Sequence, residues 1–201
     1  MRSVTSTLPP LGERIREARL RGGMSLRALA RTVGVSASLI SQIETGKSQP
    51  SVSTLYAITK ALGISVEDVF DAEPAVAPRA AATAVLHRLG PIVRPETREI
   101  LRLDSGVTWE RLGHPPGGQV DFLLVTYAPG GSSSSGDALM RHAGVEYGFL
   151  VEGQLTLTLG FEEHRLGPGD AVSFASSTPH RYRNNGIIPA VGVWFVSETP
   201  P

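Results

Sequence analysis

The spacing of apolar residues changes once along the chain, and this change limits the folds that the chain can adopt. Between residues 11 and 71, apolar residues recur every three or four positions in short runs that end at glycine, as in short helices. From residue 85 onward, short runs rich in Val, Leu, Phe, Tyr and Thr are typical of strands. Residues 72–84, rich in Ala and Pro, have no periodic apolar face and are predicted to be a linker. The sequence therefore predicts an α + β protein with two domains.

Serine and glycine mark the ends of the helices expected in the first domain. Ser25 and Ser36 each precede an apolar-periodic run, and Gly34 and Gly46 follow these runs. Serine is a preferred N-cap and glycine a preferred residue after a helix, so we expect helices between these positions. Three further helices are expected from Leu11 to the Gly22-Gly23 pair, from Pro50-Ser51 to Leu62, and from Val66 to Phe70. Together they predict a compact five-helix bundle.

The helix after Ser36 separates apolar from short polar residues. Leu39, Ile40 and Ile43 share one face, and the opposite face carries groups that can read a DNA groove. Gln42 can bond adenine through two hydrogen bonds, serines can bond bases or phosphates, and an alanine methyl can touch thymine. The candidate DNA contacts are Arg27, Arg31, Ser36, Ala37, Ser38, Ser41, Gln42 and Lys47. The alternative is a bundle whose outer face is only solvated.

The segment Ile40-Ser-Gln-Ile-Glu-Thr-Gly46, followed by Pro50-Ser-x-x-Thr-Leu55, resembles the XRE-type helix-turn-helix of phage-repressor relatives. The resemblance extends over residues 11–70. It implies an all-α, lambda-repressor-like bundle that binds a double-stranded DNA operator. It also implies a structural role for Glu44 rather than a base contact.

The second domain combines predicted strands with frequent turns. Strands are expected at residues 120–127 and within 148–159, where Leu155, Leu157 and Leu159 alternate with polar residues. The Gly- and Ser-rich run 130–136 is expected to form a flexible loop at the edge of a cavity. Many short strands with frequent turns indicate a sandwich or a small barrel.

Two motifs in this domain resemble those of the cupins, over residues 85–197. The segment His142-Ala-Gly-Val-Glu146-Tyr-Gly-Phe-Leu-Val-Glu-Gly153 is similar to the first cupin motif, and Gly167-Pro-Gly-Asp170 with Pro179-His180-x-x-x-Asn184 to the second. The resemblance implies an all-β jelly-roll barrel that commonly pairs about a two-fold axis. Cupins with four protein ligands have a histidine where this chain has Met140, which we expect to fill the cavity wall.

His142, Glu146 and His180 are the candidate metal ligands. His142 and Glu146 are four residues apart, so strand alternation can aim both into one cavity, and His180 arrives from a later strand. Two imidazoles and one carboxylate suit a divalent transition ion such as Zn, Fe, Mn, Ni or Cu. The alternative is an empty barrel in which hydrogen bonds satisfy the histidines. His87, His114 and His164 lie outside both motifs and are expected to be surface or structural residues.

The two resemblances together imply a transcription regulator whose cupin domain binds a small-molecule effector and pairs into a homodimer on an inverted repeat. The expected effector pocket consists of Met140, Arg141, Tyr147, Phe149, Phe174, Tyr182 and Trp194. Two alternatives remain. One is a mononuclear iron enzyme similar to the hydroxypropylphosphonate epoxidases, whose His-Ala-Gly-x-Glu segment matches residues 142–146. The other is a metal-free cupin that only dimerises.

Composition excludes several other classes of protein. The chain has no cysteine, which excludes disulfides and thiolate metal sites, and no apolar run of the roughly 20 residues that cross a bilayer. Residues 1–10 lack the apolar core of a signal peptide and are expected to be a disordered arm, so a cytoplasmic location is expected. Residues 1–71 carry nine Lys and Arg against six Asp and Glu, a charge of +3. The arginines at 14, 16, 19 and 21 suit either a polyanionic partner or a solvated helix face.

Overall fold

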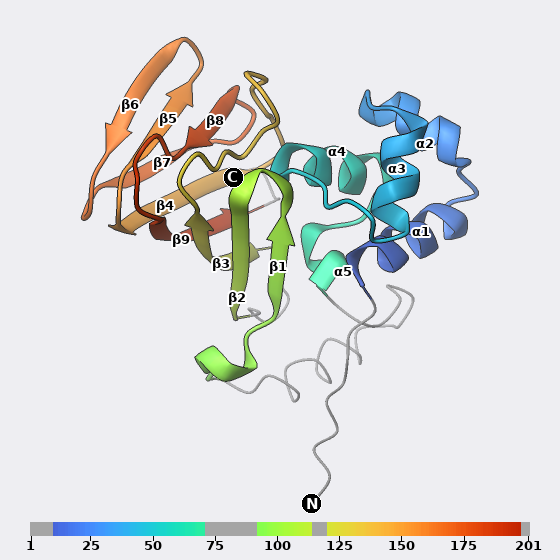
Figure 1. Cartoon of the computed structure of the whole chain (residues 1–201), viewed down its shortest axis with the longest axis horizontal. Helices are drawn as coiled ribbons and strands as arrows, with labels where there is room; N and C mark the ends of the chain where they lie inside the picture. Colours follow the sequence, from blue (N-terminus) through green and yellow to red (C-terminus); the bar gives the residue numbers. More distant parts are fainter. Residues whose placement is uncertain (1–9, 71–91, 114–119, 198–201) are drawn as a thin grey trace, which may run out of the picture.

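A helical bundle and a β barrel lie side by side in the computed structural model, which describes residues 10–70, 92–113 and 120–197 (Figure 1). The predicted change from helices to strands is confirmed. The linker predicted at 72–84 lies outside the described residues, as does the arm predicted at 1–10 except for Pro10.

Local capping chemistry sets the ends of the helices. The side chains of Ser25, Ser36 and Ser51 each accept a hydrogen bond from a backbone N–H three residues on, at 3.1 to 3.2 Å. Gly34 and Gly63 follow α2 and α4 in the left-handed conformation that favours glycine. Within the described part of the chain, no helix is both long and apolar enough to span a membrane. The helices are α1 (Leu11–Arg21), α2 (Leu26–Val33), α3 (Ala37–Glu44), α4 (Val52–Leu62) and α5 (Val66–Phe70).

The second domain consists of two antiparallel sheets. A six-stranded sheet has the order β1-β2-β3-β9-β4-β7, and a three-stranded sheet has the order β6-β5-β8. The strand predicted at 120–127 is β3, whereas 148–159 contains the end of β4 and the whole of β5, which are separated by a turn at Gly153, where φ is +80°. The strands are β1 (Ile100–Leu103), β2 (Val107–Gly113), β3 (Val120–Tyr127), β4 (Val145–Glu152), β5 (Leu155–Leu159), β6 (Glu162–Leu166), β7 (Ala171–Ala175), β8 (His180–Arg183) and β9 (Ala190–Ser197).

The Ser-rich run is packed into the protein, contrary to the prediction of a flexible loop. Ser132, Ser133 and Ser134 are each at most 8% exposed. The backbone N–H of Ser133 donates to Tyr182 O at 3.0 Å, and its hydroxyl accepts from Tyr182 N at 3.1 Å. Hydrogen bonds to β8 thus satisfy polar groups that the sequence alone suggested would be solvated.

Candidate functional site

The polar face of α3 is exposed, and the opposite face holds the helix in the bundle. Ile40 and Ile43 are buried at 0% and 1% exposure, and Leu39 packs against the same core. Seven of the eight candidate DNA contacts are exposed, namely Arg27, Arg31, Ser36, Ser38, Ser41, Gln42 and Lys47. Ala37 is half-buried against the helical core, which limits its methyl as a contact to thymine.

A buried ion pair fixes the end of α3 against α1. The guanidinium of Arg19 donates to both carboxylate oxygens of Glu44, at 2.5 and 2.8 Å, and to the carbonyl of Met24 at 2.9 Å. Arg19 is therefore neither a solvated residue nor a free cation for DNA, and Glu44 orients the helix instead of reading bases. A bidentate pair of this kind adds geometric specificity to helix packing.

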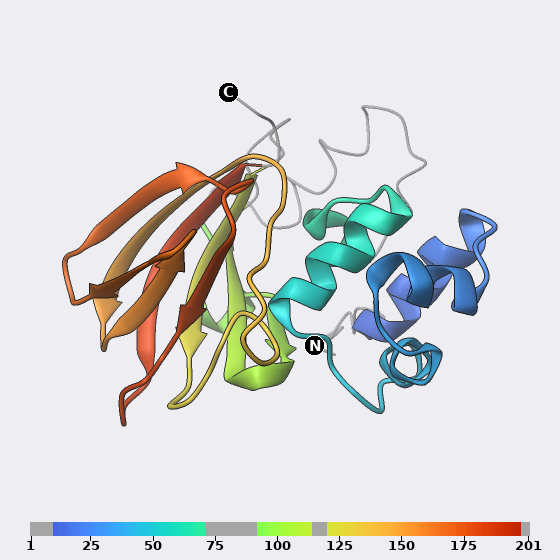
Figure 2. The same ribbon diagram turned by 90° about the horizontal axis from the view of Figure 1, so that it is seen from above.

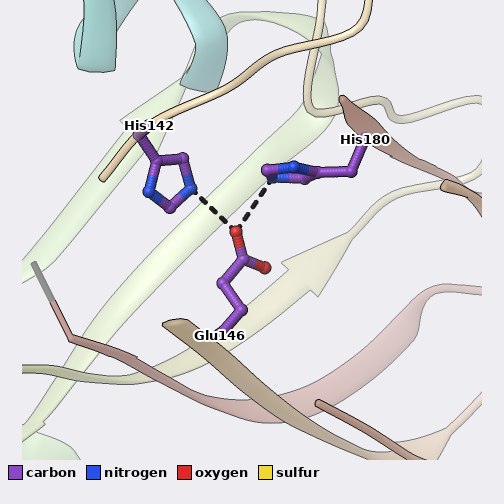
Figure 3. Close-up of side chains that lie close together, drawn as sticks. All are labelled: His142, Glu146 and His180. Carbon is purple, nitrogen blue, oxygen red and sulfur yellow. Dashed lines mark hydrogen bonds and ion pairs between the residues drawn. The ribbon is translucent and has the colours of Figure 1, made fainter. Parts of the chain in front are cut away.

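The three candidate metal ligands meet inside the barrel (Figure 3). Nε2 of His142 lies 2.8 Å from Oε1 of Glu146, and Nε2 of His180 lies 2.9 Å from the same oxygen. Glu146 comes from β4 and His180 from β8, while His142 precedes β4. One ligand atom from each residue lies within 4.8 Å of the other two, and all three side chains are buried.

Hydrogen bonds fix both imidazoles with Nε2 directed at this point. Nδ1 of His142 lies 3.1 Å from Ala143 O, and Nδ1 of His180 lies 2.8 Å from Thr178 O. A carbonyl oxygen only accepts, so both Nδ1 atoms carry a proton and each Nε2 is left as the ligating nitrogen. Nε2 of His180 is buried and has no hydrogen bond of acceptable geometry among the described residues. The donor set therefore fits a divalent ion with two imidazole ligands and one carboxylate ligand.

Opposing effects set the charge state of the cluster. Burial alone would raise the pKa of Glu146, but its interactions with His142 and His180 outweigh burial and lower the pKa to about 2. Burial disfavours the charged form of His180, yet the adjacent Glu146 carboxylate raises the pKa of His180 above its usual value. In the absence of metal, the cluster therefore holds an ionised carboxylate and favours an imidazolium beside it.

A chain of hydrogen bonds holds the carboxylate from behind. The hydroxyl of Tyr182 donates to Oε2 of Glu146 at 3.2 Å, and Trp194 Nε1 donates to that hydroxyl at 3.3 Å. Oε1 is thereby left for the histidines. Outer contacts of this kind orient metal ligands.

Three of the seven residues expected in the effector pocket line the cavity beside Glu146, namely Met140, Tyr182 and Trp194. Phe174 borders the cluster formed by His142, Glu146 and His180, with its ring centroid 5.0 Å from that of His180.

Arg141, Tyr147 and Phe149 do not line the cavity beside Glu146. Arg141 is exposed, and Tyr147 and Phe149 are 54% and 48% exposed on the outer face of β4. Side chains alternate along a strand, so the inward direction of Glu146 sends both aromatic neighbours outward. Applied along this strand, the alternation predicts from the sequence alone that Tyr147 and Phe149 lie outside the cavity.

Sequence reasoning also missed cavity residues, and two of them come from the other domain. Trp109 of β2 and Tyr127 of β3 line the cavity, as do Val52 and Tyr56 of α4. The alternation along β3 could have found Tyr127, but no local pattern brings α4 to the barrel. Of the three histidines outside the motifs, His164 is exposed, and His87 and His114 lie outside the described residues.

Comparison with known proteins assigns both halves of the chain. Residues 15–69 match the family described as Helix-turn-helix (HTH_3), and residues 123–196 match the Cupin domain family (Cupin_2). The chain is 28% identical over 175 residues to the HTH-type transcriptional regulator PuuR of Escherichia coli K12, covering 86% of each protein. It is 27% identical over 176 residues to the HTH-type transcriptional regulator SutR of the same organism, covering 88% of each.

A solved structure shares the whole two-domain fold. An HTH_3 family transcriptional regulator from Vibrio cholerae superposes with a TM-score of 0.64 at 21% identity, over 94% of this chain and 96% of the other. At this identity the similarity shows the fold alone. The two family matches, together with the regulators that align over most of the sequence, show that the chain belongs to the transcription regulators that join an XRE-type helix-turn-helix domain to a cupin domain.

Proposed function

We propose that the protein binds a specific DNA operator through α3 and that its cupin domain senses a small-molecule effector. The exposed polar face of α3 is the observation that carries this proposal. Gln42 and the serines at 38 and 41 are free to enter a major groove, while the buried Arg19–Glu44 pair keeps the helix in one orientation. Arg27, Arg31 and Lys47 flank this face and suit contacts to phosphates.

The metal cluster belongs to the sensing half of this proposal. His142, Glu146 and His180 would hold one divalent ion, which would offer open coordination positions to an effector. The metal is Zn, Fe, Mn, Ni or Cu on the basis of its nitrogen and oxygen ligands. Regulators aligned over most of the chain support sensing over catalysis, and genomic DNA as the partner supports a cytoplasmic location.

A homodimer on an inverted repeat is the third part of the proposal. The short side chains of α3 offer few base contacts, so a second half-site about 34 Å away would supply specificity. The outer face of β4 and β9 carries Tyr147, Phe149, Val151 and Phe195, each between 42% and 54% exposed, beside a groove of about 370 Å³. An exposed apolar stripe of this kind suits a second copy of the chain.

DNA selection with the full chain tests the first part. Random duplexes are enriched for binding, and the selected sequence is measured by fluorescence anisotropy with Gln42→Ala. Loss of the bidentate contact should weaken the selected operator by about 1–3 kcal/mol and relax preference at one base pair. Gln154→Ala, at an exposed residue of the barrel, is the matched control and should bind as the parent does. Failure to enrich any sequence at low salt would refute operator binding.

Sedimentation equilibrium tests the dimer. Phe149→Glu places a charge on the outer stripe and should shift the protein towards monomer. Phe161→Glu makes the same change at a fully exposed residue in the β5–β6 turn and should leave the oligomeric state unchanged. Equal behaviour of the two variants would exclude this face as the interface.

A further inference from the structure

Helix α4 is in direct contact with the barrel at the opening of its cavity, and Figure 2 shows it as the helix nearest the sheets. Two backbone hydrogen bonds cross the contact. Ser53 N donates to Ser133 O at 2.9 Å, and Asp104 N donates to Pro50 O at 2.9 Å. The first of these satisfies an N–H in the first turn of α4, which has no partner within the helix. The barrel therefore helps to cap a helix of the DNA-binding domain.

Tyr56 places an aromatic ring of α4 against the metal cluster. Its ring stacks on the imidazole of His142, with centroids 4.1 Å apart and planes 4° from parallel. It also meets Trp109 edge to face, at 6.0 Å between centroids. Tyr56 is 7% exposed and Val52, one turn earlier, is 2% exposed, so both side chains are buried by the barrel and the bundle together.

With α4 in place, the cavity is too small for an organic effector. Val52 and Tyr56 form its wall on the helical side, and Met140 and Glu146 with residues of β2, β3, β8 and β9 form the rest. The free space is about 20 Å³, which is close to what one water molecule needs. Sites for small molecules usually enclose about 300–1,000 Å³. A metal ion fits between the three ligands, but a metabolite does not fit beside them.

We propose that α4 is the movable wall of the effector site, so that an organic effector enters only when Val52 and Tyr56 leave the barrel. This inference rests on the proposed sensing function and specifies its regulation. The ligand it implies is a small molecule with an apolar body, because aromatic and aliphatic side chains line the space around Glu146.

The other side of α4 explains why such a movement reaches the DNA-binding surface. Leu55 and Ile58 are fully buried in the helical core, and α4 packs against α1, α2 and α5. A packed core moves as a unit rather than deforming continuously. Expulsion of Tyr56 from the barrel therefore carries α3 with it and changes the spacing of two recognition helices in a dimer.

A permanently filled cavity tests the proposal without DNA, metal or a known effector. Val125→Phe enlarges a cavity-lining side chain of β3, and Leu124→Phe makes a somewhat smaller enlargement at the preceding residue, which faces the other side of the sheet. Because the chain has no cysteine, Glu17→Cys on α1 and Glu163→Cys on β6 give two exposed sites for nitroxide labels. Double electron–electron resonance then measures the distance between the two labels, and unlabelled protein is added so that few label pairs form between different chains.

The two enlargements should differ. Val125→Phe should lengthen or broaden the interdomain distance, and Leu124→Phe should keep the parental distance. A parental distance in Val125→Phe would overturn the proposal, since the barrel would then accommodate bulk without releasing α4. Loss of operator binding in the separate DNA assay would affect the proposed function but not this measurement.

A second measurement works from the helical side if Val125→Phe distorts the barrel. Both tryptophans of the chain, Trp109 and Trp194, line the cavity and are 4% exposed. Tyr56→Ala should raise the quenching of their fluorescence by acrylamide, and Tyr56→Phe, which keeps the ring, should not. Equal quenching in Tyr56→Ala and the parent would show that Tyr56 does not close the cavity.

Discussion

Gly12 lies where α1 packs against the end of α3, and it permits a backbone approach that no other residue allows. A Cβ atom at Gly12 would lie 2.0 Å from the carbonyl oxygen of Ile43 and 2.9 Å from that of Glu44. An ordinary contact of about 3.4 Å therefore requires the helices to separate by roughly 1.4 Å. This separation would also pull apart the buried pair formed by Arg19 and Glu44. Gly12→Ala should thus release α3 from its fixed orientation.

The expected cost follows from these two contacts. Alanine favours a helix interior by about 1 kcal/mol over glycine, but overpacking costs about 1–3 kcal/mol and breaking a buried ion pair about 3–5 kcal/mol. We expect a net loss of at least about 3 kcal/mol, which for a bundle of this size lowers the melting temperature by on the order of 10 °C or more. Circular dichroism at 222 nm follows the unfolding of the helices in the bundle.

Gly22→Ala provides the control, at the residue that follows α1. Gly22 has φ −74°, and the nearest atoms to an added Cβ lie 3.6 and 3.7 Å away. This variant should be neutral or up to about 1 kcal/mol more stable, because alanine restricts the unfolded chain. If Gly12→Ala melted at the same temperature as Gly22→Ala, the close approach of α1 to α3 would be refuted.

Three further predictions concern the barrel. Asn184→Ala removes a fully buried amide that forms hydrogen bonds with three backbone groups, and it should lower the free energy of unfolding in urea by about 2–4 kcal/mol. Asn185→Ala, at an exposed neighbour, should lower it by less than about 0.5 kcal/mol. The lowered pKa of Glu146 stabilises the metal-free protein above pH 4.5, and this contribution of about 3 kcal/mol should disappear as the pH falls from 4.5 to about 2. An unchanged loss of stability over this pH range in Glu146→Gln would contradict the prediction. The raised pKa of His180 means that protons compete with metal at and above pH 6.5, so zinc affinity should rise with pH there and calorimetry in two buffers should detect proton release on binding.

Local chemistry explains which parts of the fold could be predicted from the sequence. The serine caps at 25, 36 and 51 and the turn at Gly34 depend on neighbouring residues only, so the sequence determines them directly. The convergence of the three metal ligands followed from strand alternation together with the cupin resemblance. These predictions needed no knowledge of how the two domains meet.

The failures share a dependence on distant contacts. Gly- and Ser-rich composition suggested a mobile loop at 130–136, but β8 and α4 supply hydrogen-bond partners for Ser133 from far along the sequence. The sequence does not identify Tyr56 as a cavity residue, because its position on α4 equally suits the core of the bundle. Contacts between separate domains leave no periodic signal in either of them.

The two hydrogen bonds across the α4 contact join backbone to backbone, at Ser53 with Ser133 and at Asp104 with Pro50. Every residue except proline offers the same N–H, and every residue offers the same carbonyl. Substitutions at these four positions can therefore accumulate over evolutionary time without removing either bond, provided that 53 and 104 do not become proline. The contact between the two domains therefore depends on the path of the backbone, and distant relatives can retain it when none of its side chains are shared.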